Sequence, residues 1–510
     1  MSDVSYQASA AFPGHARGVA AGRRQIKVIM IKGKGLLLAV AASSFMLPAW
    51  GQTVSLDSCR HMAVHNNKTI RMAEEGIIGA GYRKKAATAA YLPGIDFTGG
   101  YMYNQQQIEL LAENAMLPTL KFDPATGKYN PNLLTGPDGI PVKNPQTGKY
   151  IPSEVAVIPK EAMVYDTHNV FAGAFTLTQP VFMGGQIRAL NQITRYAEKL
   201  AVAMRNSAVQ DIIYAVDEAY WQVVSLKEKK RLAESFVNLV DTLRFNVNAM
   251  LRAGVATRSD SLQVEVKYNE ACIALTKVEN GLTLSRMALA QICGLPVDTR
   301  MELEDEQLKG AAQLPRELTL DMADVYARRQ DLSALRHGID IARHKAKFDL
   351  GNMLPKVALV GAYSFSNPNV NHGFEKKFGG GFSVGATLTI PLWHWGGRYN
   401  QYKAAQTTTK IAELALADAE EKVELQVNQA KFSYQEAFKT YEMTVSNMKA
   451  ANENLRNAET GFREGVLTTD DVIGAQTAWL KANSERIDSE IGIRLCNVYL
   501  SKVLGTLDEN

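Results

Sequence analysis

The chain has 510 residues, with 56 basic and 52 acidic side chains and a formal net charge of +4. Residues 1–51 contain six of the basic residues and one acidic residue, so a chain that begins at residue 52 carries 50 basic and 51 acidic residues. This near-neutral balance lacks the basic excess of a nucleic-acid-binding protein, and we expect no nucleic-acid partner.

The N-terminus has the order of segments that is typical of a secretory signal. Lys32 and Lys34 precede an apolar run at residues 36–47, and small residues follow up to Gly51. A membrane anchor is the alternative, but about twelve apolar residues are too few for a helix that needs about 20 to cross a bilayer. We predict that residues 1–51 are a leader and signal peptide, cleaved after Gly51. The sequence does not distinguish Met1 from Met30 as the start.

Residues 52–294 are predicted to form a helix, two strands, a long helix, a tight turn and a returning helix. The first helix is expected at residues 55–90, and the strands follow from alternating apolar residues near 95–103 and 171–177. No Gly or Pro occurs between Gln186 and Met250, which predicts one long helix. The returning helix is expected at residues 259–293.

Residues 319–510 repeat this order after a linker at residues 295–318. A helix is expected at 319–350, strands near 357–365 and 382–390, a Gly- and Pro-free helix at 398–460, and a returning helix at 470–504. The same order in both halves predicts an internal structural repeat.

The two predicted hairpins differ in their connections. The second is short, whereas the first runs from about residue 106 to 169 and contains the related phrases PATGKYNP and PQTGKYIP. Its richness in Pro, Gly, Asn and Lys predicts an exposed insertion, and the sequence does not reveal its role.

Four strands of about ten residues match the span of a tilted outer-membrane strand but are too few to close a barrel. An open sheet in lipid would leave the backbone groups of its edges unsatisfied, so copies of the same chain must complete it. Three copies give twelve strands, with the long helices forming a cylinder below the membrane.

The repeated segments carry a resemblance to a known family. The phrases LTQPVFMGGQ (177–186) and LTIPLWHWGGR (388–398), the doubled helical turn and the opening VSLDSCRHMAVHNN make residues 53–507 similar to the TolC-type outer-membrane efflux protein family. The resemblance implies an α+β membrane protein: a trimeric 12-stranded β-barrel, four strands per chain, continuing into a long periplasmic α-helical coiled-coil tunnel. The chain would lie in the cell outer membrane and contact its lipid.

The resemblance also implies a function. Such a homotrimer is a passive exit duct for drugs, small solutes or polypeptides in a tripartite efflux or type I secretion system, where it meets a periplasmic adaptor (membrane fusion) protein and an inner-membrane pump. The sequence identifies neither the cargo nor the particular pump and adaptor. The alternative is a periplasmic coiled-coil scaffold or adaptor without a pore, which the four strands disfavour.

No catalytic, cofactor or metal site is predicted. The glycine-rich FGGGFSVG (378–385) lacks the Lys-Ser/Thr of a phosphate loop, and His61 and His65 flank Met62 where a zinc protease has Glu. The chain is therefore not expected to be an enzyme. Four cysteines fit no disulfide framework by spacing, and their pairing stays open: Cys59, Cys272, Cys293 and Cys496.

The predicted strand-to-helix bends combine a proline that ends the strand with glycines that allow the chain to turn. These residues are Pro180, Gly184, Gly185, Pro391, Gly396 and Gly397.

The doubled phrases LRAGVATRSD and FREGVLTTDD predict two tight helical turns, here called the first tip and the second tip. A Gly that ends one helix and a Thr that caps the next explain their form, while apolar residues in between suggest a contact surface. The resemblance implies that the tips meet the adaptor. The first tip consists of Gly254, Val255, Ala256 and Thr257, and the second of Gly465, Val466, Leu467 and Thr468.

Asp470 and Asp471 begin the last predicted helix. Acidic residues suit a helix start, and three copies would also place an acidic ring that attracts cations. Asp471 matches an aspartate of the periplasmic constriction in the family, although Gly474 stands where a second aspartate often follows. We expect Asp470 and Asp471 to form the periplasmic gate, and Asp260, their counterpart, to start its helix.

Overall fold

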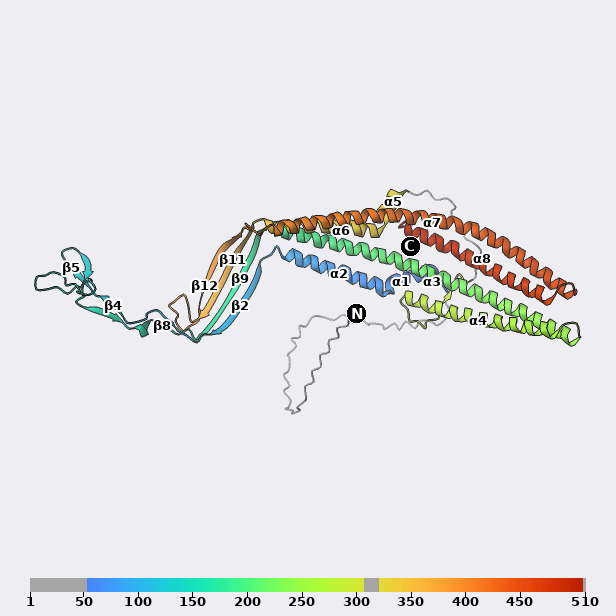
Figure 1. The fold of residues 1–510 in the computed structure, drawn as a ribbon, viewed down its shortest axis with the longest axis horizontal. Helices are drawn as coiled ribbons and strands as arrows, with labels where there is room; N and C mark the ends of the chain where they lie inside the picture. The colour runs from blue at the N-terminus through green and yellow to red at the C-terminus, as the bar shows by residue number, and fades with distance from the viewer. Residues whose placement is uncertain (1–52, 307–320, 508–510) are drawn as a thin grey trace, which may run out of the picture. The chain divides into compact units, whose positions relative to one another are not determined.

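A computed structural model describes residues 53–306 and 321–507 of the chain. The predicted leader at residues 1–51 lies outside the described residues. Figure 1 shows a sheet followed by long helices, with a β-rich excursion at the other end of the sheet.

The four predicted strands are present and form one antiparallel sheet. They are β2 (Gly94–Tyr103), β9 (Asn169–Met183), β11 (Lys356–Asn367) and β12 (Gly379–Thr389), in the order β12-β11-β9-β2. The central pair joins the two halves of the chain, because β9 pairs with β11 from Phe171↔Asn367 to Met183↔Lys356. The outer strands β2 and β12 each have one partner among the described residues.

The two faces of the sheet differ in chemistry. Phe97, Phe175, Tyr363 and Phe382 lie in one row of paired residues, and the ring centroids of Phe97 and Phe175 are 4.8 Å apart. Phe365 lies on the same face and stacks on Phe97, with ring centroids 6.4 Å apart. The next row, on the opposite face, contains Thr98, Ala174, Ser364 and Gly381. One face is therefore aromatic and apolar, and the other is small and polar.

The long connection at residues 104–168 is a ladder of short strand pairs. It consists of β3 (Ile108–Glu109) with β8 (Val164–Tyr165), β4 (Ala115–Pro118) with β7 (Val155–Ile158), and β5 (Leu120–Asp123) with β6 (Lys128–Pro131). The related phrases form similar turns, with φ of +67° at Gly127 and +65° at Gly148. The sequence predicted the exposed insertion but not its strands.

Each half of the chain contains a 67-residue helix and a 35-residue returning helix. They are α3 (Gln186–Arg252) with α4 (Arg258–Ile292), and α7 (Gly397–Arg463) with α8 (Thr469–Val503). At 1.5 Å per residue the long helices extend about 100 Å. These four helices begin and end within about three residues of the predicted positions.

The shorter helices are interrupted where a single helix was predicted. Residues 55–90 form α1 (Leu56–Asn66) and α2 (Lys68–Ala89), and residues after 321 form α5 (Met322–Arg328) and α6 (Gln330–Leu350). The side chain at each break donates a hydrogen bond to a carbonyl at the end of a returning helix. The Asn67 Nδ2 donates to the Ile292 oxygen (2.9 Å), and the Arg329 Nη1 donates to the Val503 oxygen (3.0 Å). These tertiary acceptors explain breaks that helix periodicity does not indicate.

The helices pack in a definite order. α3 contacts α2, α4, α6 and α8, and α7 contacts α6 and α8. α2 and α4 therefore flank one side of α3, while α6 and α8 lie between α3 and α7. Within the described residues, none of the helices combines the length and the apolar character needed to cross a membrane.

The largest core lies where α1, α3 and α4 meet the segment after α4. Tyr220, Val223, Val224 and Leu289 are completely or almost completely buried there. The strand β1 (Thr53–Val54) pairs in parallel with β10 (Glu302–Leu303) beside this core, which ties the start of the described chain to the segment after α4.

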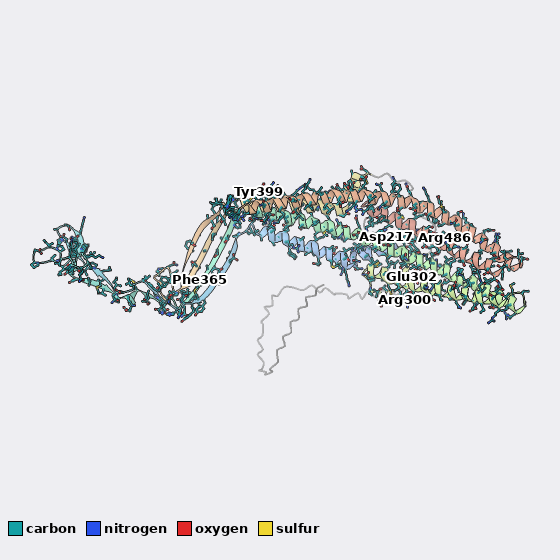
Figure 2. All side chains as sticks on the ribbon, viewed as in Figure 1. Asp217, Arg300, Glu302, Phe365, Tyr399 and Arg486 are labelled. Atoms are coloured by element: carbon teal, nitrogen blue, oxygen red, sulfur yellow. The ribbon has the colours of Figure 1, made fainter. Side chains whose placement is uncertain are left out.

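An ion pair lies within this region. The buried Asp217 of α3, labelled in Figure 2, accepts hydrogen bonds from the Nε (2.7 Å) and Nη2 (2.5 Å) of Arg60 on α1. Burial raises the pKa of Asp217, and the hydrogen bonds and charge of Arg60 oppose that effect. The bidentate geometry fixes α1 against α3.

Replacement of Asp217 by Ala should strongly destabilise the protein, because it leaves Arg60 without its buried partner. We expect a loss of about 3–5 kcal/mol in the free energy of unfolding. The matched control is Asp418→Ala, which removes an exposed pair with Lys422 (2.7 Å) and should cost at most about 1 kcal/mol. Denaturant unfolding of the solubilised protein measures both, and equal effects would contradict the assigned importance of Asp217.

Candidate functional site at the helical tips

The two tips share one backbone geometry. Gly254 and Gly465 adopt φ of +81° and +73°, which a glycine reaches without strain, and they end α3 and α7. The Val255 amide donates to the Met250 oxygen (3.0 Å), and the Val466 amide to the Gly461 oxygen (2.8 Å). These bonds satisfy carbonyls at the helix ends and reverse the chain.

Each tip ends in a capping box that starts the returning helix. In the first tip the Asp260 amide donates to the Thr257 hydroxyl (3.2 Å), and the Thr257 amide donates to the Asp260 carboxylate (2.8 Å). Thr468 and Asp471 form the same pair in the second tip, at 3.3 Å and 2.8 Å. Hydrogen bonds from the threonine side chain and backbone lower the pKa of both aspartates. Both carboxylates therefore have a local structural role.

Asp470 has a different partner from Asp471. Its carboxylate accepts a hydrogen bond from the Gln263 side chain on α4, so it joins the first helical hairpin to the second. Figure 1 shows both tips at the same end of the helices. Of the two predicted gate residues, Asp470 thus links the hairpins and Asp471 caps its own helix.

The apolar tip residues divide into exposed and packed positions. Val255 and Val466 are 71% and 78% exposed. Ala256 instead packs against the cluster that includes Val247 and Phe462, and Leu467 packs against Leu455, Ala458 and Ala475. The residue directly before each cap therefore points inward. Only the second tip has the hydrophobic-staple pattern, with Leu467 before the cap and Val472 at the fourth helical position. Only Val255 and Val466 present large apolar side chains outward.

Not every predicted strand-to-helix bend lies at a strand end. β9 continues through Pro180 to Met183, and its register with β11 shifts between Val357 and Ala358, so the prediction that Pro180 ends the strand is wrong. A bulge accommodates the proline that lacks an amide donor. Pro391 does follow the end of β12.

The glycines occupy the turns into the long helices. Gly184, Gly185 and Gly396 have φ of +60°, +79° and +72°, and Gly397 is the first residue of α7. A side chain at Gly184 would collide with the Gly351 oxygen and the Leu354 Cβ, so the glycine also permits a close approach between the two halves.

Several exposed apolar residues line the outer helices. On α7 they recur at helical spacing, and a second stripe is exposed on α4, which packs mainly against α3. The α7 residues are Ile411, Leu414, Leu425, Phe432 and Met443, and the α4 residues are Leu262, Val266, Ile273 and Leu284.

In the described part of the chain, no group of three or more His, Cys, Asp or Glu residues is arranged to hold a metal ion. His61 and His65 stack on one another on α1, with ring centroids 4.2 Å apart, and the His65 Nδ1 is 2.9 Å from the His61 oxygen. Their arrangement is accounted for by the helix.

Known proteins share this sequence and fold. A family model described as outer membrane efflux protein matches residues 159–295 and 323–506. The chain is 23% identical over 367 residues to the alkaline protease secretion protein AprF of Pseudomonas aeruginosa, covering 69% of this chain and 72% of AprF. It is 21% identical over 388 residues to the outer membrane efflux protein BepC of Brucella suis, covering 72% and 82%.

The fold also matches a solved outer membrane channel. The Campylobacter jejuni CmeC structure aligns with a TM-score of 0.68 and 14% identity, over 88% of this chain and 85% of CmeC. At this identity the match shows a shared fold.

The packed position of Leu467 leads to a local stability prediction. Leu467→Ala should weaken the packing on Leu455 and Ala458 by about 1–2 kcal/mol, whereas Val466→Ala should change it by at most about 0.5 kcal/mol. Hydrogen exchange at the amides of residues 455–462 reports this directly. Faster exchange in both variants, or in neither, would contradict the division of the tip into packed and exposed residues.

Proposed function

The chain belongs to the outer membrane efflux protein family, and from this we propose that three copies close a single barrel that continues into a helical exit tunnel. The family predicted from the sequence is confirmed, as is an outer-membrane location with an extension into the periplasm. The chain is an outer-membrane channel subunit for export. A periplasmic scaffold without a pore is not supported.

The trimer proposal rests on the sheet, whose outer strands β2 and β12 each lack a second partner within the described residues. Its apolar face suits lipid and its polar face suits a water-filled lumen. The strands alternate in direction from β12 to β2, so β12 of one copy and β2 of the next would meet antiparallel. Their backbone groups would then find partners, as lipid requires. Three copies would give the twelve strands expected from the sequence.

The exposed stripes on the helices support the same arrangement. α7 and the α2–α4 side lie at opposite ends of the packing order, so a ring of copies would bring α7 of one subunit against α4 of the next. Counted at 1.5 Å per residue from the tips, Phe432 and Met443 are level with α4 and would be buried against that helix, which removes apolar surface from water. Ile411, Leu414 and Leu425 lie beyond the end of α4 and would face α1 and α2 of the next subunit.

We propose that residues 52–294 and 319–510 are structural repeats joined by a linker at 295–318. Support comes from their matched helix lengths and from a shared joint. Gly294 packs on Asn66 after α4, and Gly505 packs on Arg328 after α8. The cylinder would then have two similar sectors per chain.

As an exit duct the protein would act through shape and charge rather than chemistry. The family consists of channel proteins, and the duct would neither make nor break bonds in its cargo. AprF is named for protease secretion and BepC for efflux, so both polypeptides and small molecules are candidate cargo. A periplasmic adaptor and an inner-membrane pump would supply direction and energy.

The exposed valines provide a test of adaptor contact. Val255→Asp together with Val466→Asp should weaken the contact about tenfold or more, because burying even a neutral polar group without a hydrogen bond costs about 1–3 kcal/mol and a carboxylate costs more. Export from cells should fall while the solubilised trimer and its conductance in planar bilayers stay unchanged. The control Arg258→Asp changes charge beside the first tip without removing an apolar side chain. Unchanged export in the double variant would contradict a docking role.

The proposed periplasmic gate at Asp470 and Asp471 leads to a prediction about ion selectivity. Asp470→Asn with Asp471→Asn should lower the preference for cations, because six carboxylates of the trimer would lose their charge at the tunnel end. The reversal potential in a salt gradient across a planar bilayer measures this preference. Asp260→Asn controls for the loss of a capping box. The proposal fails if the double variant keeps its selectivity or if the control loses as much.

A further inference from the structure

We propose that Cys59 and Cys293 form a disulfide bond that joins α1 to the end of α4 in the mature protein. Neither the family nor the function assigns a role to these residues. Cys59 lies near the start of α1, and Cys293 is the C-cap of α4, 234 residues away. Both are completely buried in the same core cluster.

The Cys293 side chain reaches Cys59 across the joint between α1 and α4. The Cys293 Sγ lies 3.6 Å from the Cys59 oxygen, and the Cys59 thiol hydrogen-bonds to the Cys293 sulfur. This bond raises the pKa of Cys59 and lowers the pKa of Cys293.

Contacts that do not involve sulfur hold the backbone around the pair. The Asn67 Nδ2 donates to the Ile292 oxygen (2.9 Å), directly before Cys293. Directly after it, a Cβ at Gly294 would lie 2.6 Å from the Asn66 Cβ, so only glycine permits this approach. Arg60, next to Cys59, is fixed by Asp217. The fold thus brings both cysteines together without the bond.

The chemistry suits the location. The helices of an outer-membrane channel lie in the periplasm, which is an oxidising compartment. While the chain folds and the cysteines are still accessible, the Cys293 thiolate would attack the disulfide of a periplasmic thiol–disulfide oxidoreductase, forming a mixed disulfide and releasing one thiolate of that enzyme. The Cys59 thiolate would then attack the Cys293 sulfur and release the second. Two electrons and the two thiol protons pass to the oxidoreductase, which becomes a dithiol.

The bond would link only the first of the two joints, the one between α1 and the end of α4, and not the second, between α5 and the end of α8. At the second joint, Gly505 packs on Arg328 and the Arg329 Nη1 donates to the Val503 oxygen (3.0 Å), but Leu504 stands at the C-cap where Cys293 stands in the first. The first joint also holds the start of the described chain through β1 and β10. A link across 234 residues would restrict the unfolded chain strongly.

Peptide mapping tests the assignment directly. The full chain is purified from the outer membrane of a Gram-negative host, denatured in excess alkylating reagent, and digested with trypsin without reduction. We expect the peptide of residues 287–300 to be linked to the peptide that ends at Arg60, and the link to vanish on reduction. Cys272 and Cys496 lie on separate peptides and should be alkylated. Alkylation of both Cys59 and Cys293, or a link from either to another cysteine, would overturn the proposal.

A second measurement tests what the bond does. Reduction should lower the denaturant midpoint of the wild-type protein and of the control Cys272→Ala with Cys496→Ala. It should leave the midpoint of Cys59→Ala with Cys293→Ala unchanged. A shift of equal size in the two double variants, or no shift in the wild-type protein, would overturn the claim that this bond holds the joint.

Discussion

The structure depends on one constraint: every backbone amide and carbonyl of a sheet in lipid must find a hydrogen-bond partner. A single chain supplies four antiparallel strands and leaves the outer sides of β2 and β12 open within the described residues. The alternating direction of the strands allows those two edges to complete one another in a ring of copies. In the proposed barrel the aromatic face would contact lipid outside and the polar face would contact water inside.

The helices below the sheet also need partners for the backbone groups at their ends, and they find them within the chain. Each long helix runs without a break from a glycine turn at the sheet to a tip. In each half, two shorter helices take the place of one longer helix: α1 with α2 in the first half, and α5 with α6 in the second. Asn67 and Arg329 interrupt these pieces and donate to the last carbonyls of α4 and α8. Side chains at the joints thus satisfy helix ends that would otherwise be buried without partners, while the tips reverse the chain through local bonds alone.

Local pattern predicted most of the fold, and tertiary contacts account for what it missed. Gly- and Pro-free stretches and doubled turns located α3, α4, α7 and α8, and period-two alternation located the four strands. Pattern could not show that Pro180 lies at a bulge, because the bulge depends on β11. Nor could it separate Asp470 from Asp471, since Gln263 is 207 residues from Asp470 in the chain. The proximity of Cys59 to Cys293 has the same long-range origin.

Cross-linking between edge strands tests the central claim most directly. Thr98 of β2 shares the polar face with Ser383, Gly385 and Thr387 of β12. In a chain without native cysteines, Thr98→Cys is combined in turn with Ser383→Cys, Gly385→Cys or Thr387→Cys, and outer membranes are oxidised. The account predicts that at least one pair links chains into trimers on a denaturing gel, whereas Thr98→Cys with Ser364→Cys on the central strand β11 does not. Single chains from every edge pair would contradict closure of the barrel through β2 and β12.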